Sequence, residues 1–341
     1  MLKNTKVLVG FSGGVDSTAA VILLQKAGYE VVGLCFNVLD NYFSEKTQAA
    51  ADRLGIKLIN KCVASEFKEK VINPFILEYE NGRTPNPCIL CNPAVKFKTL
   101  IEAADEEGIY YIATGHYART QLYDGKYYIA KAKNERKDQS YMLYRLPEDI
   151  IERLILPLGG AIDKADVRRL VQEENIANFG EKDSQDICFI PDGDYKSYLM
   201  LHGAINKPGN FIDTDGVKLG QHQGILSYTV GQRKGLGLSL GKPAYVLEIK
   251  DNDVVVGSEE SLFQNNVTVN QLFWTGFEAT DGMKLRCKLR YSAKDSECTI
   301  KRLADGKIEL IFDEAQRAPT PGQSAVLYYN QLVIGGGFIV K

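Results

Sequence analysis

The sequence contains no run of about 18 uncharged apolar residues, so it predicts no membrane-spanning helix. Its first residues show neither the layout of a signal peptide nor an Arg- and Ser-rich presequence. Seven cysteines in 341 residues are too few, and an odd number, for a disulfide framework. We therefore expect a cytoplasmic protein, in which thiols stay reduced.

Basic residues do not outnumber acidic residues in the sequence. The chain has 41 Lys and Arg against 43 Asp and Glu, which gives a formal net charge of −2. Proteins that wrap nucleic acid usually carry a basic domain or stripe, so an RNA contact would have to use a local patch. The candidate patch is KAKNERKDQ at 131–139, whose charge pattern alone favours a solvated loop.

The first part of the chain alternates strand-like and helix-like segments. The expected strands are 6–11, 29–38, 56–63 and 109–115, and the expected helices are 16–28, 45–55 and 93–108. Near-continuous apolar strands that alternate with helices indicate an α/β protein with a doubly wound parallel sheet, covered on both faces. In such sheets ligands collect at the carboxyl ends of the strands.

The character of the chain changes along its second half. Residues 140–200 have helical patterning, whereas turn residues follow after 204 and short alternating strands follow from 267. Asp281-Gly282 and Asp305-Gly306 are hairpin turn signals, and the pattern predicts a small β-barrel. Because 341 residues exceed one ordinary core, we expect three parts. They are a catalytic domain at 1–204 with a helical insertion at about 140–200, a central β-rich module at 205–263 and a C-terminal β-barrel at 264–341.

SGGVDS, at residues 12–17, lies between the first expected strand and the first expected helix. Two glycines let the backbone approach an oxyanion closely. The N–H groups at the helix start and the hydroxyls of Ser12 and Ser17 can then surround phosphate oxygens. The stretch has neither the GK[ST] of a Walker A loop nor GxGxxG. The alternative is a tight strand–helix turn capped by serine.

TPNPCILCNP, at 84–93, holds the pair Cys88 and Cys91. Structural zinc would require a second pair, and neither another CxxC nor an HxxxH occurs. A thioredoxin-like dithiol normally occupies its own redox fold rather than a Pro-rich loop. Cys91 precedes Asn92 and Pro93, where we expect a helix to begin, so the helix dipole should lower the pKa of its thiol.

A family resemblance arises from these motifs together. SGGVDS after a first strand resembles the PP-loop of the ATP pyrophosphatase superfamily, whose members cleave ATP between the α and β phosphates. NPCxxCN, GHYAR (115–119), KDQSYML (137–143), SQDICFI (184–190) and SYTVGQRKGLG (227–237) follow in order. The set closely resembles the tRNA-specific 2-thiouridylase family over essentially the whole chain. The resemblance implies ATP-dependent 2-thiolation of the wobble uridine, U34, of tRNAs for Lys, Glu and Gln, with release of AMP and pyrophosphate.

The resemblance also implies roles for single residues. ATP would be bound by Gly10, Phe11, Ser12, Gly13, Gly14, Val15, Asp16, Ser17, Phe36 and Gly115. Asp16 would help to place Mg²⁺. The target base and the tRNA would be contacted by Asn86, Pro87, Cys88, Lys137, Asp138, Gln139, Arg290 and Tyr291. His116, within GHYAR, is expected to face the site, where it either positions phosphate or base or packs.

Sulfur chemistry would use the cysteines. By resemblance, Cys188 carries a persulfide supplied by a cysteine desulfurase or a sulfur-relay protein, and Cys91 is the partner nucleophile. Many family members have aspartate where this chain has Cys88. This departure opens a second mechanism, in which Cys88, Cys91 and Cys188 hold a [4Fe–4S] cluster with an open iron site. Another PP-loop AMP-forming synthetase is the remaining alternative.

Overall fold

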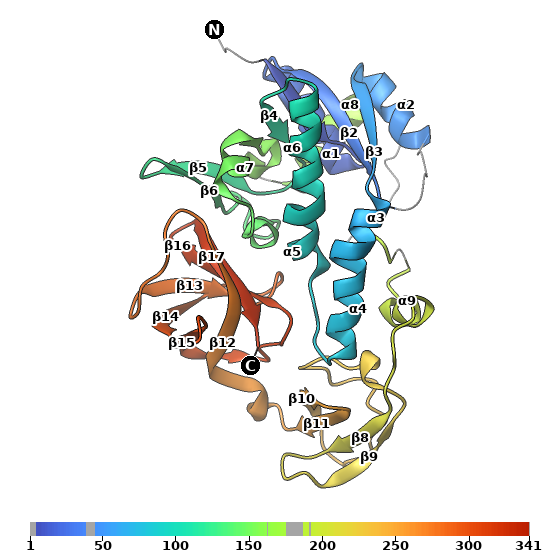
Figure 1. Cartoon of the computed structure of the whole chain (residues 1–341), viewed down its shortest axis with the longest axis vertical. Coiled ribbons are helices and arrows are strands. Elements are labelled where there is room, and N and C mark those ends of the chain that lie inside the picture. The colour runs from blue at the N-terminus through green and yellow to red at the C-terminus, as the bar shows by residue number, and fades with distance from the viewer. Residues whose placement is uncertain (1–4, 39–44, 162, 175–186, 191, 341) are drawn as a thin grey trace.

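The computed structural model describes residues 5–38, 45–161, 163–174, 187–190 and 192–340. Figure 1 shows three sheets along the longest axis of the molecule: a parallel sheet near the N-terminus, a barrel, and a small sheet at the opposite end. Within the described part of the chain, no helix combines the length and the apolar character that a membrane span requires. The sequence-based expectation of an α/β fold with a terminal barrel is confirmed.

The N-terminal sheet is parallel, with strand order β3-β2-β1-β4-β7. Its strands are β1 (Lys6–Gly10), β2 (Glu30–Asn37), β3 (Lys57–Cys62), β4 (Tyr111–Ala113) and β7 (Leu154–Ile155). The first four fall within the expected strand ranges. The two-residue strand β7 lies within the segment expected to be helical and was not predicted, because so short a strand has no periodicity of its own.

Different helices cover the two faces of this sheet. Successive side chains of β1 point to opposite faces, so Leu8 packs in one core cluster and Val7 in another. The Leu8 cluster includes Leu100 and Ile151, and the Val7 cluster includes Ala19. The helices are α1 (Val15–Lys26), α2 (Glu45–Leu54), α6 (Lys98–Glu106), α7 (Glu148–Arg153) and α8 (Lys164–Glu173), with 3₁₀ turns at Ser140–Leu143 and Pro157–Gly160. Packing on both faces leaves the carboxyl ends of the strands available for a site.

The helical run that carries the cysteine pair begins earlier than the sequence predicted. It consists of α5 (Pro87–Cys91), a π-helical segment (Asn92–Phe97) and α6. Asn86 caps it, since its Oδ1 accepts a hydrogen bond from the Cys88 N–H at 3.1 Å, and Pro87 occupies the first turn. The stretch TPNPCILCNP contains Asn-Pro twice, and the sequence analysis places the start of the helix at the second of them, Pro93. That proline instead lies inside the run, where the π-helical geometry accommodates its missing N–H.

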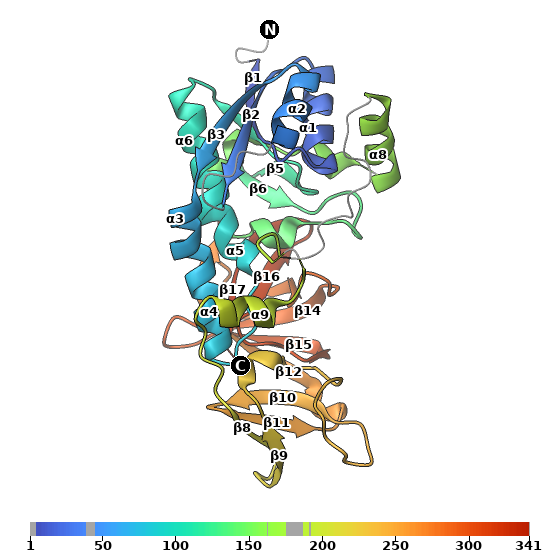
Figure 2. The ribbon, with the colours of Figure 1, turned by 90° about the vertical axis from the view of Figure 1, so that its right-hand side faces the viewer.

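A further helical run that the sequence analysis did not predict leads away from the sheet. It contains α3 (Ala64–Phe67), a π-helical segment (Lys68–Ile72) and α4 (Asn73–Glu80). Figures 1 and 2 show it extending from β3 toward the small sheet. Its end abuts that sheet, because a Cβ on Gly82 would lie 2.5 Å from the Ile249 side chain. Helix α9 (Tyr195–Leu201) packs beside it through stacked rings of Tyr79 and Tyr195, whose centroids are 5.1 Å apart.

The small sheet has the order β10-β11-β8-β9. Its strands are β8 (Gly209–Ile212), β9 (Lys218–His222), β10 (Tyr245–Lys250) and β11 (Asp253–Gly257), and 3₁₀ turns lie at Ile225–Ser227 and Glu260–Leu262. Phe211, Val246 and Val254 form the centre of its own core cluster. The turn-rich composition after residue 204 therefore corresponds to short strands around a separate small core.

The C-terminal strands close into a barrel, since β12 pairs with both β15 and β17. They are β12 (Phe263–Trp274), β13 (Lys284–Lys288), β14 (Ser296–Arg302), β15 (Ile308–Arg317), β16 (Ser324–Tyr329) and β17 (Leu332–Ile339). Asp305-Gly306 joins the paired strands β14 and β15, as predicted. The hairpin predicted at Asp281-Gly282 is wrong. That turn follows β12 and leads into β13, but β13 pairs with β14 and β16 and not with β12.

A hairpin from the N-terminal half extends the barrel sheet. It consists of β5 (Arg119–Tyr123) and β6 (Lys126–Ala130), and Ala130 pairs with Leu332 of β17. Its turn residues Asp124 and Gly125 have φ of 49° and 75°, as a two-residue hairpin turn of type I′ requires. The sequence analysis did not predict this hairpin, although Asp124-Gly125 is a hairpin turn signal of the same kind. It fastens the barrel to the loop that follows β4.

Candidate active site

The phosphate loop is held by its own serine hydroxyls. Ser12 N–H donates to Ser17 Oγ at 3.3 Å, and Ser17 Oγ donates to the Gly14 carbonyl oxygen at 3.0 Å. The two serine Oγ atoms are 3.2 Å apart. Gly13 has φ of 74°, in the left-handed region that glycine adopts without strain. The loop is therefore closed on itself at the N-terminus of α1, where backbone N–H groups attract anions.

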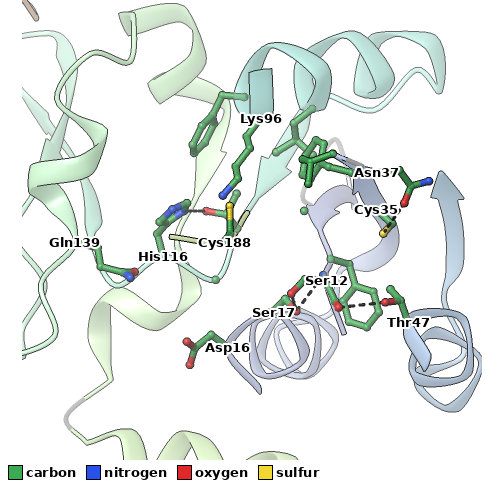
Figure 3. A pocket seen from close by; sticks show the side chains of 18 residues that line it. Ser12, Asp16, Ser17, Cys35, Asn37, Thr47, Lys96, His116, Gln139 and Cys188 are labelled. Carbon is green, nitrogen blue, oxygen red and sulfur yellow. Dashed lines mark hydrogen bonds between the residues drawn. The ribbon is translucent and has the colours of Figure 1, made fainter. Parts of the chain in front are cut away.

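A cavity of about 590 Å³ opens in front of this loop. Figure 3 shows the side chains around it. The lining comprises Gly10, Phe11, Ser12, Asp16, Ser17, Cys35, Phe36, Asn37, Val38, Thr47, Lys96, Phe97, Leu100, Thr114, Gly115, His116, Gln139 and Cys188. Seven of the predicted ATP-binding residues are among these lining residues. Gly13, Gly14 and Val15, the other three, are their neighbours in the loop and the first turn of α1.

The ring of Phe36 packs on the backbone of the first strand. A Cβ added at Gly10 would lie 3.3 Å from Phe36 Cε2 and 3.6 Å from Thr114 Cγ2. A larger residue at position 10 would therefore displace the ring. Phe36 lies near the carboxyl end of β2, beside the cavity, and its contact with adenine stays a prediction.

The loop after β4 holds the start of α1. A Cβ on Gly115 would lie 2.8 Å from both the carbonyl carbon and the carbonyl oxygen of Asp16, so only glycine fits there without a shift. Two residues on, the buried Tyr117 donates its hydroxyl to Asp16 Oδ1 at 2.8 Å. A carboxylate fixed in this way beside a phosphate loop fits a role in placing Mg²⁺, since carboxylate oxygen is a preferred ligand of that ion.

The three informative cysteines differ in exposure. Cys91 is buried, Cys88 is half-buried and Cys188 is exposed. Burial raises the pKa of the Cys91 thiol to about 12, against the opposing charge of Lys96. The predicted lowering of this pKa is wrong, for two reasons. Cys91 ends α5 instead of starting a helix, and the thiol is desolvated. Burial also raises the pKa of Cys88.

Lys96 is a functional residue that the sequence analysis missed. It lines the cavity, and Figure 3 shows its ammonium group pointing toward Cys188 and His116. Burial pulls the pKa of Lys96 down, but attraction by Cys91, Cys88 and Cys188 outweighs this and raises it overall. Lys96 follows Cys91 by five residues, and the π-helical segment places residues at that spacing on one face. A lysine on the cysteine helix was the available signal.

His116 is held as a neutral imidazole. Its ring stacks on Phe97 with centroids 6.0 Å apart, and Nδ1 lies 2.8 Å from Thr114 Oγ1. Burial, and then the nearby Lys96 charge, lower the pKa of His116 to about 3. The ring thus packs on Phe97 and also lines the cavity, as expected, whereas a role in positioning phosphate or base stays a prediction.

Hydrogen bonds to the buried Asp138 carboxylate hold the segment at 137–139, which was predicted to contact tRNA. The Asp138 carboxylate is 5% exposed and accepts hydrogen bonds from Ala132 N–H at 2.9 Å and Ser140 Oγ at 2.7 Å. It therefore shapes the loop, while Lys137 is half-buried and Gln139 lines the cavity. That these residues contact tRNA stays a prediction.

The barrel residues named from the sequence reach the same region. Tyr291 has its pKa raised by burial and by the charges of Asp138 and Cys88, so its hydroxyl lies near the cysteine helix. Arg290 instead bonds to two other segments of the chain, which contain Val230 and Thr320. Its Nη2 donates to Thr320 Oγ1 and to the Val230 carbonyl oxygen, the latter at 3.1 Å. The contacts of Arg290, Tyr291, Asn86 and Pro87 with tRNA or the target base stay predictions.

The iron–sulfur alternative finds no preformed site. Among the residues described, no three His, Cys, Asp or Glu side chains are grouped as a metal ion requires. This holds for Cys88, Cys91 and Cys188 in their present positions. Of the SQDICFI motif, 184–186 lie outside the described residues.

The fold and the cavity define the class of the protein. A parallel sheet with SGGVDS between its first strand and first helix, and a cavity beyond the strand ends, is a nucleotide-binding domain of the PP-loop ATP pyrophosphatase class. Residues 5–192 match the family described as tRNA methyl transferase HUP domain. Residues 197–258 match the tRNA methyl transferase PRC-barrel domain, and 264–339 the aminomethyltransferase beta-barrel domain.

The chain belongs to the tRNA-specific 2-thiouridylase family. It is 42% identical to tRNA-specific 2-thiouridylase MnmA of Clostridium botulinum over 99% of this chain and 98% of the relative. Identity is 42% to the protein of that name from Carboxydothermus hydrogenoformans, over 100% of this chain and 99% of the relative. It is 40% to that from Clostridioides difficile, over 100% and 99%. The resemblance found in the motifs is confirmed.

Proposed function

We propose that this protein is an ATP-dependent tRNA-uridine 2-sulfurtransferase that thiolates the wobble uridine U34 of tRNAs for Lys, Glu and Gln. The observation that carries the proposal is that Cys188 and the phosphate loop line one cavity. ATP cleavage and sulfur transfer can therefore act on one base held in one place. Membership of the 2-thiouridylase family supports the same reaction.

Adenylation is the first step, because the C2 oxygen of uracil is a poor leaving group. That oxygen attacks the α-phosphorus of ATP, and pyrophosphate leaves. Backbone N–H groups at the start of α1 and the hydroxyls of Ser12 and Ser17 stabilise the negative charge of the departing phosphates. Asp16 would hold Mg²⁺, which neutralises phosphate charge when bound.

Sulfur transfer is the second step. The terminal sulfur of a Cys188 persulfide attacks C2 and displaces AMP, which leaves the base joined to Cys188 through the transferred sulfur. The Cys91 thiolate then attacks Sγ of Cys188. The Cys188 sulfur–sulfur bond breaks, its electron pair stays on the transferred sulfur as 2-thiouridine, and a Cys91–Cys188 disulfide forms. A thiol reductant regenerates the two thiols.

The exposure of the two cysteines suits these roles. Exposed Cys188 can accept sulfur from a cysteine desulfurase or a sulfur-relay protein. Buried Cys91, with its raised pKa, stays a thiol that outside oxidants do not readily attack. The charge of Lys96 favours the Cys91 thiolate when the disulfide-forming step requires it. Because the thiols do not form a preformed metal group, no step here uses a cluster.

The test is single-turnover thiolation of unmodified tRNA with ATP and a persulfide donor, followed by mass spectrometry of the nucleosides. Enzyme prepared aerobically without iron is compared with enzyme reconstituted anaerobically with iron and sulfide. We expect the iron-free enzyme to form 2-thiouridine. Activity restricted to the reconstituted enzyme would overturn the persulfide mechanism, and no thiolation by either would overturn the proposed function.

A pair of variants locates the sulfur carrier. Cys188→Ala should abolish 2-thiouridine formation by iron-free enzyme. Cys62→Ala is the matched control, because Cys62 is also exposed but lies at the end of β3 outside the cavity lining. Unchanged thiolation by Cys188→Ala would exclude Cys188 as the carrier.

A further inference from the structure

Tyr117 connects the phosphate-loop helix to the 137–139 segment through three hydrogen bonds. Its hydroxyl donates to Asp16 Oδ1 at 2.8 Å. Its backbone N–H donates to Gln139 Oε1 at 2.9 Å, and its carbonyl oxygen accepts from the Gln139 N–H at 2.7 Å. The tyrosine is 3% exposed, so its ring has little freedom, and the bonds of its hydroxyl and its N–H to the half-buried Asp16 and Gln139 are partly buried.

Both ends of this connection are stiff. On one side the backbone of Gly115 passes against the backbone of Asp16, so the two segments move together. On the other side the buried Asp138 carboxylate ties Ala132 to Ser140 and closes the loop that carries Gln139. The two hydrogen bonds between Gln139 and the Tyr117 backbone therefore transmit a movement of the 137–139 segment to Tyr117.

The bond to Asp16 is charge-assisted and directional. A phenol O–H that donates to a carboxylate is among the stronger hydrogen bonds in proteins. It fixes the rotamer of Asp16, whose side chain lines the cavity beside the phosphate loop. Tyr117 itself is not among the lining residues, so it would act through Asp16 rather than on ATP.

We propose that Tyr117 is a positioning residue that links tRNA engagement at 137–139 to the orientation of Asp16 toward the ATP phosphates. This inference rests on the proposed function. Binding of tRNA to the segment holds Gln139, Gln139 holds the Tyr117 backbone, and the Tyr117 hydroxyl presents the carboxylate. The consequence is a coupling between the two substrates: each tightens the binding of the other by the same factor.

The experiment measures that factor with full-length protein. Affinity for α,β-methylene-ATP, which cannot be cleaved between the α and β phosphates, is determined with Mg²⁺ in the absence and presence of saturating tRNA. We expect tRNA to tighten binding in the wild type by at least about fivefold. In Tyr117→Phe, which loses only the hydroxyl, the factor should fall close to one.

A control variant and a double variant test whether the coupling depends on the Tyr117–Asp16 bond. Tyr110→Phe is the control, because it too removes a hydroxyl that donates to a carboxylate, that of Glu152 at 3.3 Å, but before β4 and outside the cavity lining. Its factor should match the wild type. Asp16→Asn and the double variant Asp16→Asn/Tyr117→Phe should have the same factor, since Tyr117 acts through Asp16.

The outcomes separate this inference from the proposed function. Wild-type protein that thiolates tRNA, together with a Tyr117→Phe factor equal to that of Tyr110→Phe, would overturn the role of Tyr117 alone. A wild-type factor of one, or additive effects in the double variant, would also overturn it. Wild-type protein that does not thiolate tRNA would overturn the proposed function instead.

Discussion

Tyr141 and Ser324 exchange two hydrogen bonds between the N-terminal part of the chain and the barrel. The Tyr141 hydroxyl donates to the Ser324 carbonyl oxygen at 2.9 Å, and the Ser324 N–H donates to the same hydroxyl at 3.2 Å. Both residues are fully buried, and burial raises the pKa of Tyr141, so its hydroxyl stays protonated. This pairing holds the barrel in the position where Tyr291 lies near Cys88.

Tyr141→Phe should therefore destabilise the protein. The change leaves a buried N–H and a buried carbonyl of Ser324 without the hydroxyl, at a cost of about 1–3 kcal/mol. The measurement is the urea midpoint of unfolding followed by circular dichroism. Tyr110→Phe, which removes a hydroxyl on the surface, should change stability by less than about 0.5 kcal/mol. Equal midpoints for the two variants would contradict the importance of the pairing.

Gly115→Ala tests the close approach between the β4 loop and α1. Its Cβ would lie 2.8 Å from two backbone atoms of Asp16, which cannot rotate away, so the start of α1 must shift. A misplacement of about 1 Å in a catalytic group can lower the rate about 10²-fold. We expect a loss of that order in single-turnover thiolation. Gly160→Ala is the control, since no atom lies within 4 Å of its Cβ position, and an equal loss there would refute the steric argument.

Patterns within short segments predicted the sheet and the phosphate loop well. The strand at 6–11 and the loop with Ser12 and Ser17 are contiguous, so their structure depends on local sequence and on burial of one strand. The start of the cysteine helix was mistaken because Asn86-Pro87 and Asn92-Pro93 carry the same local signal. In the structure Asn86 Oδ1 accepts from Cys88 N–H and caps the helix, whereas the buried Asn92 donates its Nδ2 to the Met142 carbonyl oxygen.

The chemistry of the site depends more on contacts between distant segments. The pKa of Cys91 follows from burial among side chains that the sequence does not place together. Asp138 and Arg290 were expected to contact tRNA, yet the Asp138 carboxylate bonds within its own loop and Arg290 Nη2 bonds to Thr320 of another segment. Lys96 belongs to no motif, and beyond its place on the cysteine helix its importance follows from the electrostatic effect of three thiols on its pKa.

Lys96→Met should make Cys91 less reactive. The ammonium charge lowers the pKa of Cys91 against the dominant effect of burial, so its loss raises that pKa further. Each unit of increase reduces the thiolate fraction about tenfold below the pKa. The alkylation rate of Cys91 by iodoacetamide, resolved by peptide mass spectrometry between pH 7 and 10, should fall at every pH. Lys96→Arg should retain most of the rate.

Lys98→Met is the matched control for this measurement. Lys98 lies two residues further along the same helical run, but its ammonium pairs with Glu66 at 2.5 Å on the surface. Its removal should leave Cys91 alkylation unchanged. Equal rates in wild type and Lys96→Met would show that the Lys96 charge does not act on Cys91.

His116 should make stability depend on pH below neutrality. Its pKa of about 3 in the folded protein lies below the value of about 6.5 for an unperturbed histidine, because burial and the Lys96 charge disfavour the imidazolium. The unfolded chain therefore binds a proton between these values while the folded protein does not. The stabilisation is therefore complete above about pH 6.5, falls progressively as pH is lowered below that value, and is fully lost once pH has fallen through about 3.

The variant that isolates this effect is His116→Gln, whose amide does not titrate. Between pH 6.5 and 5 the wild type should lose about 1–2 kcal/mol more stability than the variant, as measured by urea unfolding at each pH. His202→Gln, which removes an exposed imidazole, should follow the wild type. A nuclear magnetic resonance titration gives an independent check, because the His116 ring proton should not shift between pH 8 and 5. A midpoint near 6.5 would mean that water and charge reach the ring freely, and the neutral imidazole in the cavity would then be wrong.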